Sequence, residues 1–274
     1  MKRLVISLIL VIGFVAGAFG QEEASTIQKV PLSQAEIDKI ITKFTYNEKL
    51  FHEALREYVF SRSATIQTVG LGGNITGTYR RDSDMTILQD GSRMEKILFF
   101  PTPTLTEISM TPEDLEDLGG VNPFALEPAS IPNYNFSYLG KEHIDELDLY
   151  VFDVTPKVIP DPKKSKLRLF TGRVWVDDKE FEIVKSKGKA VPETKNNKFP
   201  VVETWRENID GKYSFPTYVA SNDSLVFDNG QVVRLKMRVK YNNYKLGHST
   251  VTIIGEEEPA TPAKPAASPT PNKP

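Results

Sequence analysis

Cysteine is absent from the 274-residue chain, so the protein has no disulfide bond and no thiolate for catalysis, metal binding or a lipid anchor. Histidine is scarce: His52, His143 and His248 are the three in the chain, and none belongs to a metal-binding His-x-x-x-His pair. A Gly-x-Ser-x-Gly nucleophile elbow is also missing. These absences argue against zinc and triad enzymes, and we predict a protein that is not an enzyme and uses no cofactor or metal.

Neither sign of charge is in large excess. The formal net charge is −2 and becomes about −4 when Lys2 and Arg3 are removed with the first 20 residues. Proteins that bind nucleic acids usually carry a clustered basic surface. We therefore predict no nucleic-acid partner.

A single long apolar run, Leu4 to Phe19, follows Lys2 and Arg3 and ends in Ala18-Phe19-Gly20, a step that suits signal peptidase. The run is shorter than the roughly 20 residues that cross a bilayer. We predict a cleaved secretory signal over residues 1–20 and no integral membrane span in the mature form, with a retained anchor as the alternative. Export without disulfides favours a Gram-negative periplasm.

The rest of the chain divides into three parts by composition. Residues 21–32 are polar and are predicted to be flexible. Residues 33–254 are long enough for a single large domain. Residues 255–274 are rich in proline, contain no apolar side chain larger than alanine and cannot form a core. This tail is either a spacer toward peptidoglycan or a partner, or a solvated end without a specific role.

The domain begins with a helix signal. Ser33 is a good N-cap, and Glu36 completes a capping box before apolar residues at helical spacing. Two apolar runs, ending near Phe44 and Tyr58, predict one amphipathic helix or a helix pair that must cover a surface.

Strand signals dominate the remainder. In Gly172–Val191, Val174 and Val176 alternate with Arg173 and Trp175, and a second alternating run follows the turn at Asp177-Asp178-Lys179. About eleven such segments, with Phe215–Asn222 and Ser224–Phe227 counted separately, predict a β-rich α+β fold. We expect a strongly curved antiparallel sheet, an unclosed barrel, with helices on its concave face. An insert between Pro101 and Pro132, with a short helix starting at Thr111, would act as a plug or lid.

The sequence contains more apolar side chains than are needed to form a core on one face of the sheet. The segment Leu147–Val154 is apolar on both faces, so both need cover. A concave cavity lined by apolar residues would suit an acyl chain, and a filled core is the alternative. The candidate lining residues are Phe152, Phe170, Trp175, Trp205 and Met237.

One strand, Gln231–Tyr241, alternates with unusual regularity. Arg234, Lys236, Arg238 and Lys240 share one face. This basic row is interpreted as a solvated face whose cations pair across strands with acids such as Glu180, Glu182, Glu203 or Glu207. The alternative is recognition of anionic lipid or of a carboxylate row.

Carboxylates group at Asp177-Asp178 and between Glu142 and Asp148. Both groups fall where the strand pattern calls for a turn, and neither has the spacing of a known calcium loop. A turn role is favoured, and a carboxylate-dependent hydrolase is a distant alternative.

The order of these features resembles the LolA-like, LolB-like and RseB-like superfamily of outer-membrane lipoprotein-sorting proteins. The resemblance covers Ser33 to Leu246 and rests most on GRVWVDDKEFEIVKSKGK followed by VVETWRENIDGKYSFPTYV. It implies an unclosed barrel whose concave face holds lipoprotein acyl chains without covalent chemistry. Arg62 is a candidate for the arginine that carriers of this family use.

By this resemblance the chain would be a soluble periplasmic carrier or sensor whose partner is a lipid or a lipoprotein acyl chain. The alternative is a periplasmic interaction module with an envelope protein partner, acting in envelope-stress signalling or envelope assembly.

Overall fold

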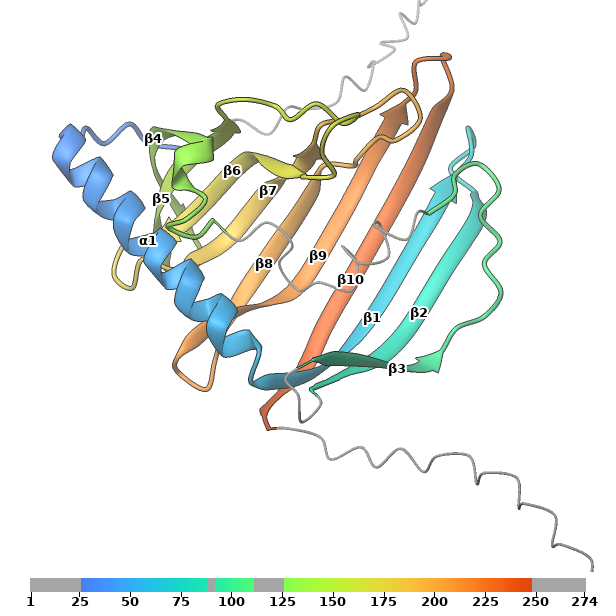
Figure 1. The fold of residues 1–274 in the computed structure, drawn as a ribbon, viewed down its shortest axis with the longest axis horizontal. Coiled ribbons are helices and arrows are strands. Elements are labelled where there is room, and N and C mark those ends of the chain that lie inside the picture. The colour runs from blue at the N-terminus through green and yellow to red at the C-terminus, as the bar shows by residue number, and fades with distance from the viewer. Residues whose placement is uncertain (1–25, 88–91, 111–125, 248–274) are drawn as a thin grey trace, which may run out of the picture.

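A computed structural model describes residues 26–87, 92–110 and 126–247 (Figure 1). The predicted signal at 1–20, the short helix expected from Thr111 and the proline-rich tail at 255–274 lie outside these residues. Within the described part, one α-helix lies across a ten-stranded antiparallel sheet.

The helix α1 spans Gln34–Leu55, and a 3-10 turn, η1, spans Ile131–Asn133. The strands are β1 Tyr58–Val69, β2 Ile75–Ile87, β3 Arg93–Phe99, β4 Tyr134–Ile144, β5 Leu147–Pro156, β6 Leu169–Asp177, β7 Ile183–Val191, β8 Val202–Ile209, β9 Tyr213–Val226 and β10 Val232–Leu246.

The strand order is β3-β2-β1-β10-β9-β8-β7-β6-β5-β4. Neighbouring strands are consecutive in sequence, with the exception of β1 and β10. These are the first and last of the described strands, and they pair with each other. β3 and β4 form the two edges, so the connection from β3 to β4 must pass from one edge to the other. The sheet curves around α1 and stays unclosed (Figure 1).

The curved antiparallel sheet is confirmed, with one strand fewer than expected. The sequence predicts a break at Asp223, after a strand that ends at Asn222, but Asn222 and Asp223 pair with Lys236 and Leu235 and continue β9 without interruption. The pairing with β10 keeps these two polar residues in the strand, because a ladder of backbone hydrogen bonds outweighs the weak strand propensity of Asn and Asp.

α1 forms as its sequence predicts. Ser33 accepts a hydrogen bond from the backbone of Glu36, and the Glu36 carboxylate accepts one from the Ser33 backbone, which completes the capping box. The two apolar runs belong to this one helix. Its buried face carries Phe44 and Phe51, whose rings contact Phe152 and Phe215 respectively.

The two faces of the sheet are covered differently. The inner face, defined here as the face toward α1, contains Phe152 and Val154 of β5 in a cluster with Phe44. The outer face carries a smaller cluster with Leu149 and Val151 of the same strand, against which Ile27 packs.

The segment before α1, which was expected to be flexible, holds this outer cover in place. Gln28 pairs with Lys141 of β4 through two backbone hydrogen bonds of 2.7 and 2.8 Å. Both apolar faces of β5 are therefore covered, one by a helix and the other by an extended segment.

We expect Phe44→Ala to lower the free energy of unfolding by about 3–5 kcal/mol, because it leaves a cavity in the core. Phe44 is fully buried, whereas Tyr46 on the same helix is 53% exposed. Urea unfolding measures the change, with Tyr46→Ala as the matched control. A loss no larger than that of the control would mean that α1 is not held through Phe44.

Candidate functional site

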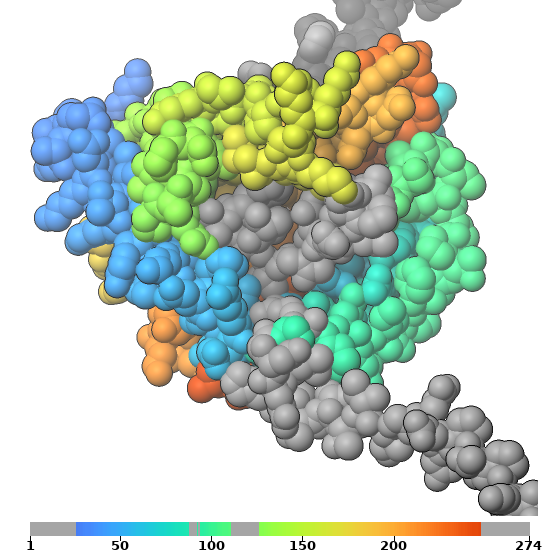
Figure 2. All heavy atoms as spheres, viewed as in Figure 1, coloured from blue at the N-terminus to red at the C-terminus, as the bar shows by residue number. Residues whose placement is uncertain are grey.

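A cavity of about 480 Å³ opens on the inner face beside α1. In Figure 2, α1 in blue, strand connections in yellow and the residues after β3 in green surround this face. The cavity floor is the inner face of β6 to β10 and β1, and its rim includes Glu107–Met110 and the loop between β7 and β8. Its volume lies in the range of small-molecule sites.

The middle of the floor is apolar because inner and outer side chains alternate along each strand. Leu235, Met237 and Val239 of β10 face the cavity, and Val219 of β9 and Ile66 of β1 lie beside them. Their outer-face neighbours on β10 are all charged. The floor can therefore accept an apolar group without leaving a polar atom unpaired.

Phe170 forms part of the cavity wall, and its ring packs closely against the backbone of two glycines. Its ring lies over Gly172 and Gly188, which pair across β6 and β7. A Cβ at Gly188 would come within 2.5 Å of the ring, so a larger residue there would displace Phe170.

A buried ion pair closes one end of the cavity. Arg206 of β8 donates two hydrogen bonds to Glu48 of α1, at 2.5 Å to Oε1 and 3.1 Å to Oε2. The two side chains are only 6% and 3% exposed, and the guanidinium also lies over the Phe51 ring, 4.8 Å from its centre. This bidentate geometry fixes the helix at one position over the sheet.

Glu182 lies close to this pair, in the turn between β6 and β7. Burial raises the pKa of Glu182 above its ordinary value of 4.5, while a hydrogen bond donated by Ser214 and the charge of Arg206 oppose the rise. The same turn is attached to α1 by Asn47, which donates to the carbonyls of Glu180 and Phe181 at 2.8 and 2.9 Å.

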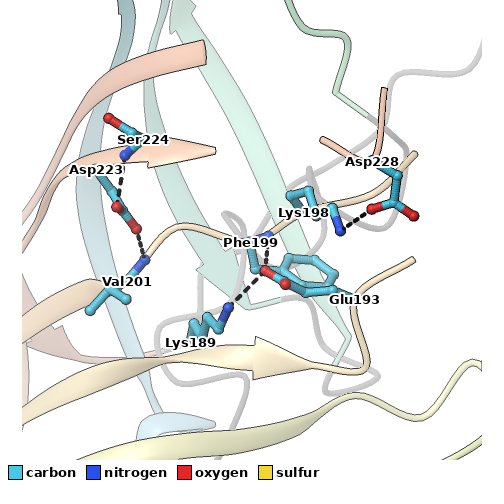
Figure 3. A network of polar contacts seen from close by, with 8 residues as sticks. All are labelled: Lys189, Glu193, Lys198, Phe199, Val201, Asp223, Ser224 and Asp228. Carbon is cyan, nitrogen blue, oxygen red and sulfur yellow. Dashed lines mark hydrogen bonds and ion pairs between the residues drawn. The ribbon is translucent and has the colours of Figure 1, made fainter. Parts of the chain in front are cut away.

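The opposite end of the cavity is bordered by a polar network (Figure 3). Glu193 accepts hydrogen bonds from the side chain of Lys189 at 2.9 Å and from the backbone of Phe199 at 3.1 Å. Lys198 donates to Asp228 at 2.9 Å. These contacts join the loop between β7 and β8 to the turn after β9 and hold the rim in shape.

Arg62, the candidate carrier arginine, lies on the inner face of β1 and is engaged in an ion pair. Its side chain is 2% exposed and donates to Glu95 of β3 at 2.5 Å, and Arg81 binds the other oxygen of Glu95 at 2.6 Å. Tyr241, which pairs with Arg62 across the strands, is buried, and burial raises its pKa to about 12.

The five residues predicted to line the cavity lie in three different parts of the structure. Phe170 and Met237 line the cavity. Phe152 is fully buried in the core beneath α1. Trp175 and Trp205 point to the outer face, where Lys185 lies between them, 4.9 and 4.3 Å from the two rings. Odd and even positions of β6 face opposite sides, so Trp175 cannot share the cavity with Phe170.

Several cavity residues were not predicted. Glu48 follows Phe44 by four residues and precedes Phe51 by three, so a charge interrupts the buried stripe of α1. That interruption in the sequence indicates a special role for Glu48. The sequence gives no such indication for the loop residues Lys195 and Asn196, because only folding brings them to the rim of the cavity.

The carboxylate groups have structural partners. Asp177 caps its own turn by accepting from the backbones of Lys179 and Glu180 at 2.9 and 2.7 Å, and Asp178 binds Lys141 at 2.7 Å. Within the described ranges, no group of three or more His, Asp or Glu side chains is arranged to hold a metal ion. No helix among the described residues has the length and apolarity of a membrane span.

We expect Arg206→Met to lower the free energy of unfolding by about 3–5 kcal/mol, because it leaves the Glu48 carboxylate buried without its cation. The double variant Glu48→Met, Arg206→Met is expected to regain most of the loss. Lys49→Met is the control, since Lys49 and Glu53 form an exposed pair at 3.7 Å whose loss costs at most about 0.5 kcal/mol. Urea unfolding would contradict the assignment if Arg206→Met and Lys49→Met cost the same.

The raised pKa of Glu182 predicts a pH dependence. The folded state binds this proton more tightly than the unfolded state, so the stabilisation is complete below pH 4.5 and is lost as pH rises through the raised pKa. Unfolding free energies measured from about pH 4 to pH 8 should decline less in Glu182→Gln than in the wild type. Glu146→Gln removes an exposed carboxylate in the turn between β4 and β5, which is not among the charges that act on Glu182, and should leave the wild-type decline unchanged.

No protein-family model and no curated protein sequence matches the chain. Among solved structures, a DUF1329 family protein from Desulfovibrio piger is similar at 14% identity and a TM-score of 0.34, with 78% of this chain and 96% of the other covered. MucB is similar at 13% identity and a TM-score of 0.26, covering 77% and 94%. MucB in complex with MucA(peri) gives 10% identity and a TM-score of 0.21, covering 71% and 92%.

Proposed function

We propose that the chain is a binding protein that takes the apolar part of an amphiphile into the cavity on the inner face of its sheet. The single observation that carries this proposal is the cavity of about 480 Å³ beside α1, with an apolar floor on the inner face of the sheet. Binding there needs no covalent chemistry, and burial of apolar surface supplies the free energy.

The arrangement of charge supports an apolar ligand that enters from the rim. Glu48 and Arg206 neutralise each other at one end and present no free charge to the floor. The rim carries Lys195 and Asn196, both exposed, so a polar head would remain in water. The ligand class that fits is therefore a chain-like lipid or the acyl part of a lipoprotein.

The family assignment is part of the same proposal. An exported N-terminus, a capped helix and the Gly172–Val191 hairpin resemble the LolA-like, LolB-like and RseB-like superfamily, whose members act in the periplasm of Gram-negative bacteria. In this proposal Phe170 and Met237 contact the ligand, Phe152 supports the floor from the core, and Trp175 and Trp205 take no part.

A protein-interaction module is the second candidate, and the edge strand β3 favours it. Its residues Ile97, Leu98 and Phe99 are 48%, 56% and 48% exposed, and β3 pairs only with β2 among the described strands. An apolar edge with free backbone groups is a common place for a partner strand to add. A module of this kind would capture an envelope protein and leave the cavity empty.

We expect the protein purified from a bacterial periplasm to take up a fluorescent fatty-acid probe, and Met237→Glu to weaken this uptake at least tenfold by placing a carboxylate on the apolar floor. Titration of probe fluorescence gives the affinity, and native mass spectrometry shows any lipid that co-purifies. Met237→Leu keeps the floor apolar and is the matched control.

A second variant distinguishes loss of binding from loss of the fold. Thr204→Trp fills the cavity without adding charge, since Thr204 lines it from β8 and is only half-buried. Weak uptake by both Met237→Glu and Thr204→Trp, with unchanged circular dichroism, is the expected result. A folded wild-type protein that takes up no probe would refute the lipid-binding proposal and favour the interaction module.

A further inference from the structure

The outer face of β10 carries four cations that have no partner among the described residues. Arg234, Lys236, Arg238 and Lys240 are all exposed and form no hydrogen bond or ion pair there. Same-face residues of a strand are about 6.6 Å apart, so the row extends over about 20 Å. The cross-strand pairing expected from the sequence is therefore wrong for this row.

The neighbouring strands explain why the cations are unpaired. The residues directly beside Lys236 and Arg238 are Gln67 and Thr65 on β1, and Asn222 and Ala220 on β9. None of these side chains carries a charge.

The acids farther out on the same face already have partners. Glu203 binds Lys185 and Lys187, at 3.4 and 3.8 Å. Asp82 binds Arg80 at 2.8 Å. The row is therefore an excess of positive charge in the interior of the sheet and not half of a charge ladder.

Apolar side chains continue the row at its end. Val226 and Val232 pair with each other across β9 and β10, on the same face as Arg234, and are 60% and 53% exposed. A basic surface next to exposed apolar side chains is typical of proteins that lie on a lipid surface.

We propose that the outer face of β10 docks on an anionic lipid surface. β10 pairs with β1 and β9, so its backbone groups are occupied and an extended acidic peptide cannot add to it as a strand. Such a peptide would make only exposed side-chain ion pairs, which contribute little. Lipid head groups can move laterally to meet all four cations, and the paired valines can enter the interface between them.

The proposal is tested by co-sedimentation of the protein, purified from a bacterial periplasm, with vesicles. Phosphatidylcholine vesicles containing phosphatidylglycerol should bind it, pure phosphatidylcholine vesicles should not, and salt should weaken the binding. Each cation near an anionic surface strengthens partitioning about fivefold. Changing Arg234, Lys236, Arg238 and Lys240 together to Gln should therefore weaken binding more than a hundredfold.

The matched control changes four exposed lysines elsewhere, Lys39, Lys157, Lys163 and Lys212, to Gln and alters the net charge by the same amount. It should bind nearly as the wild type does, because only the row contacts lipid. Met237→Glu should also bind the vesicles, so this proposal and the cavity proposal fail separately.

Three results would overturn the proposal. The first is a folded wild-type protein that ignores phosphatidylglycerol. The second is an equal loss in the row variant and the control variant, which would assign the binding to net charge alone. The third is row-dependent binding of polyglutamate without vesicle binding, which would assign the face to an acidic polypeptide.

Discussion

The attachment of α1 to the inner face is the constraint on which the rest of the structure depends. The first half of the helix places Ile40 and Phe44 in the cluster over β4 to β7, and the second half places Phe51 and Leu55 in the cluster over β1, β2, β9 and β10. One helix therefore joins two separate cores. The bidentate pair between Glu48 and Arg206 lies between them and sets where along the sheet the helix rests.

The cavity follows from that placement. A helix is about 10 Å wide, and a ten-stranded sheet is much broader, so α1 cannot cover the whole inner face. The part that it leaves open, centred on Met237 and Val219, still carries apolar side chains because the strand alternation continues there. Among the described elements, the space is thus a consequence of one short helix on a wide curved surface.

The sequence predicted the features that depend on neighbours within a segment. Strand alternation, the capping box at Ser33 and the turn at Asp177 are local, and all three are present. What it could not predict depends on pairing between distant segments. Asn222 and Asp223 stay in a strand because β10 holds them. The assignment of Trp175 and Phe170 to one cavity is an error of another kind, because their odd and even positions already place them on opposite faces of β6 by the local alternation.

β10 joins the two proposed surfaces in a single strand. Its odd positions, such as Leu235 and Met237, form the cavity floor, while its even positions, such as Lys236 and Arg238, form the basic row. Because side chains alternate with a period of two, a shift of register by one residue would exchange charge for apolar surface on both faces at once. The eleven paired positions between β1 and β10 therefore fix both surfaces together, and neither can be lost by a slip without the other.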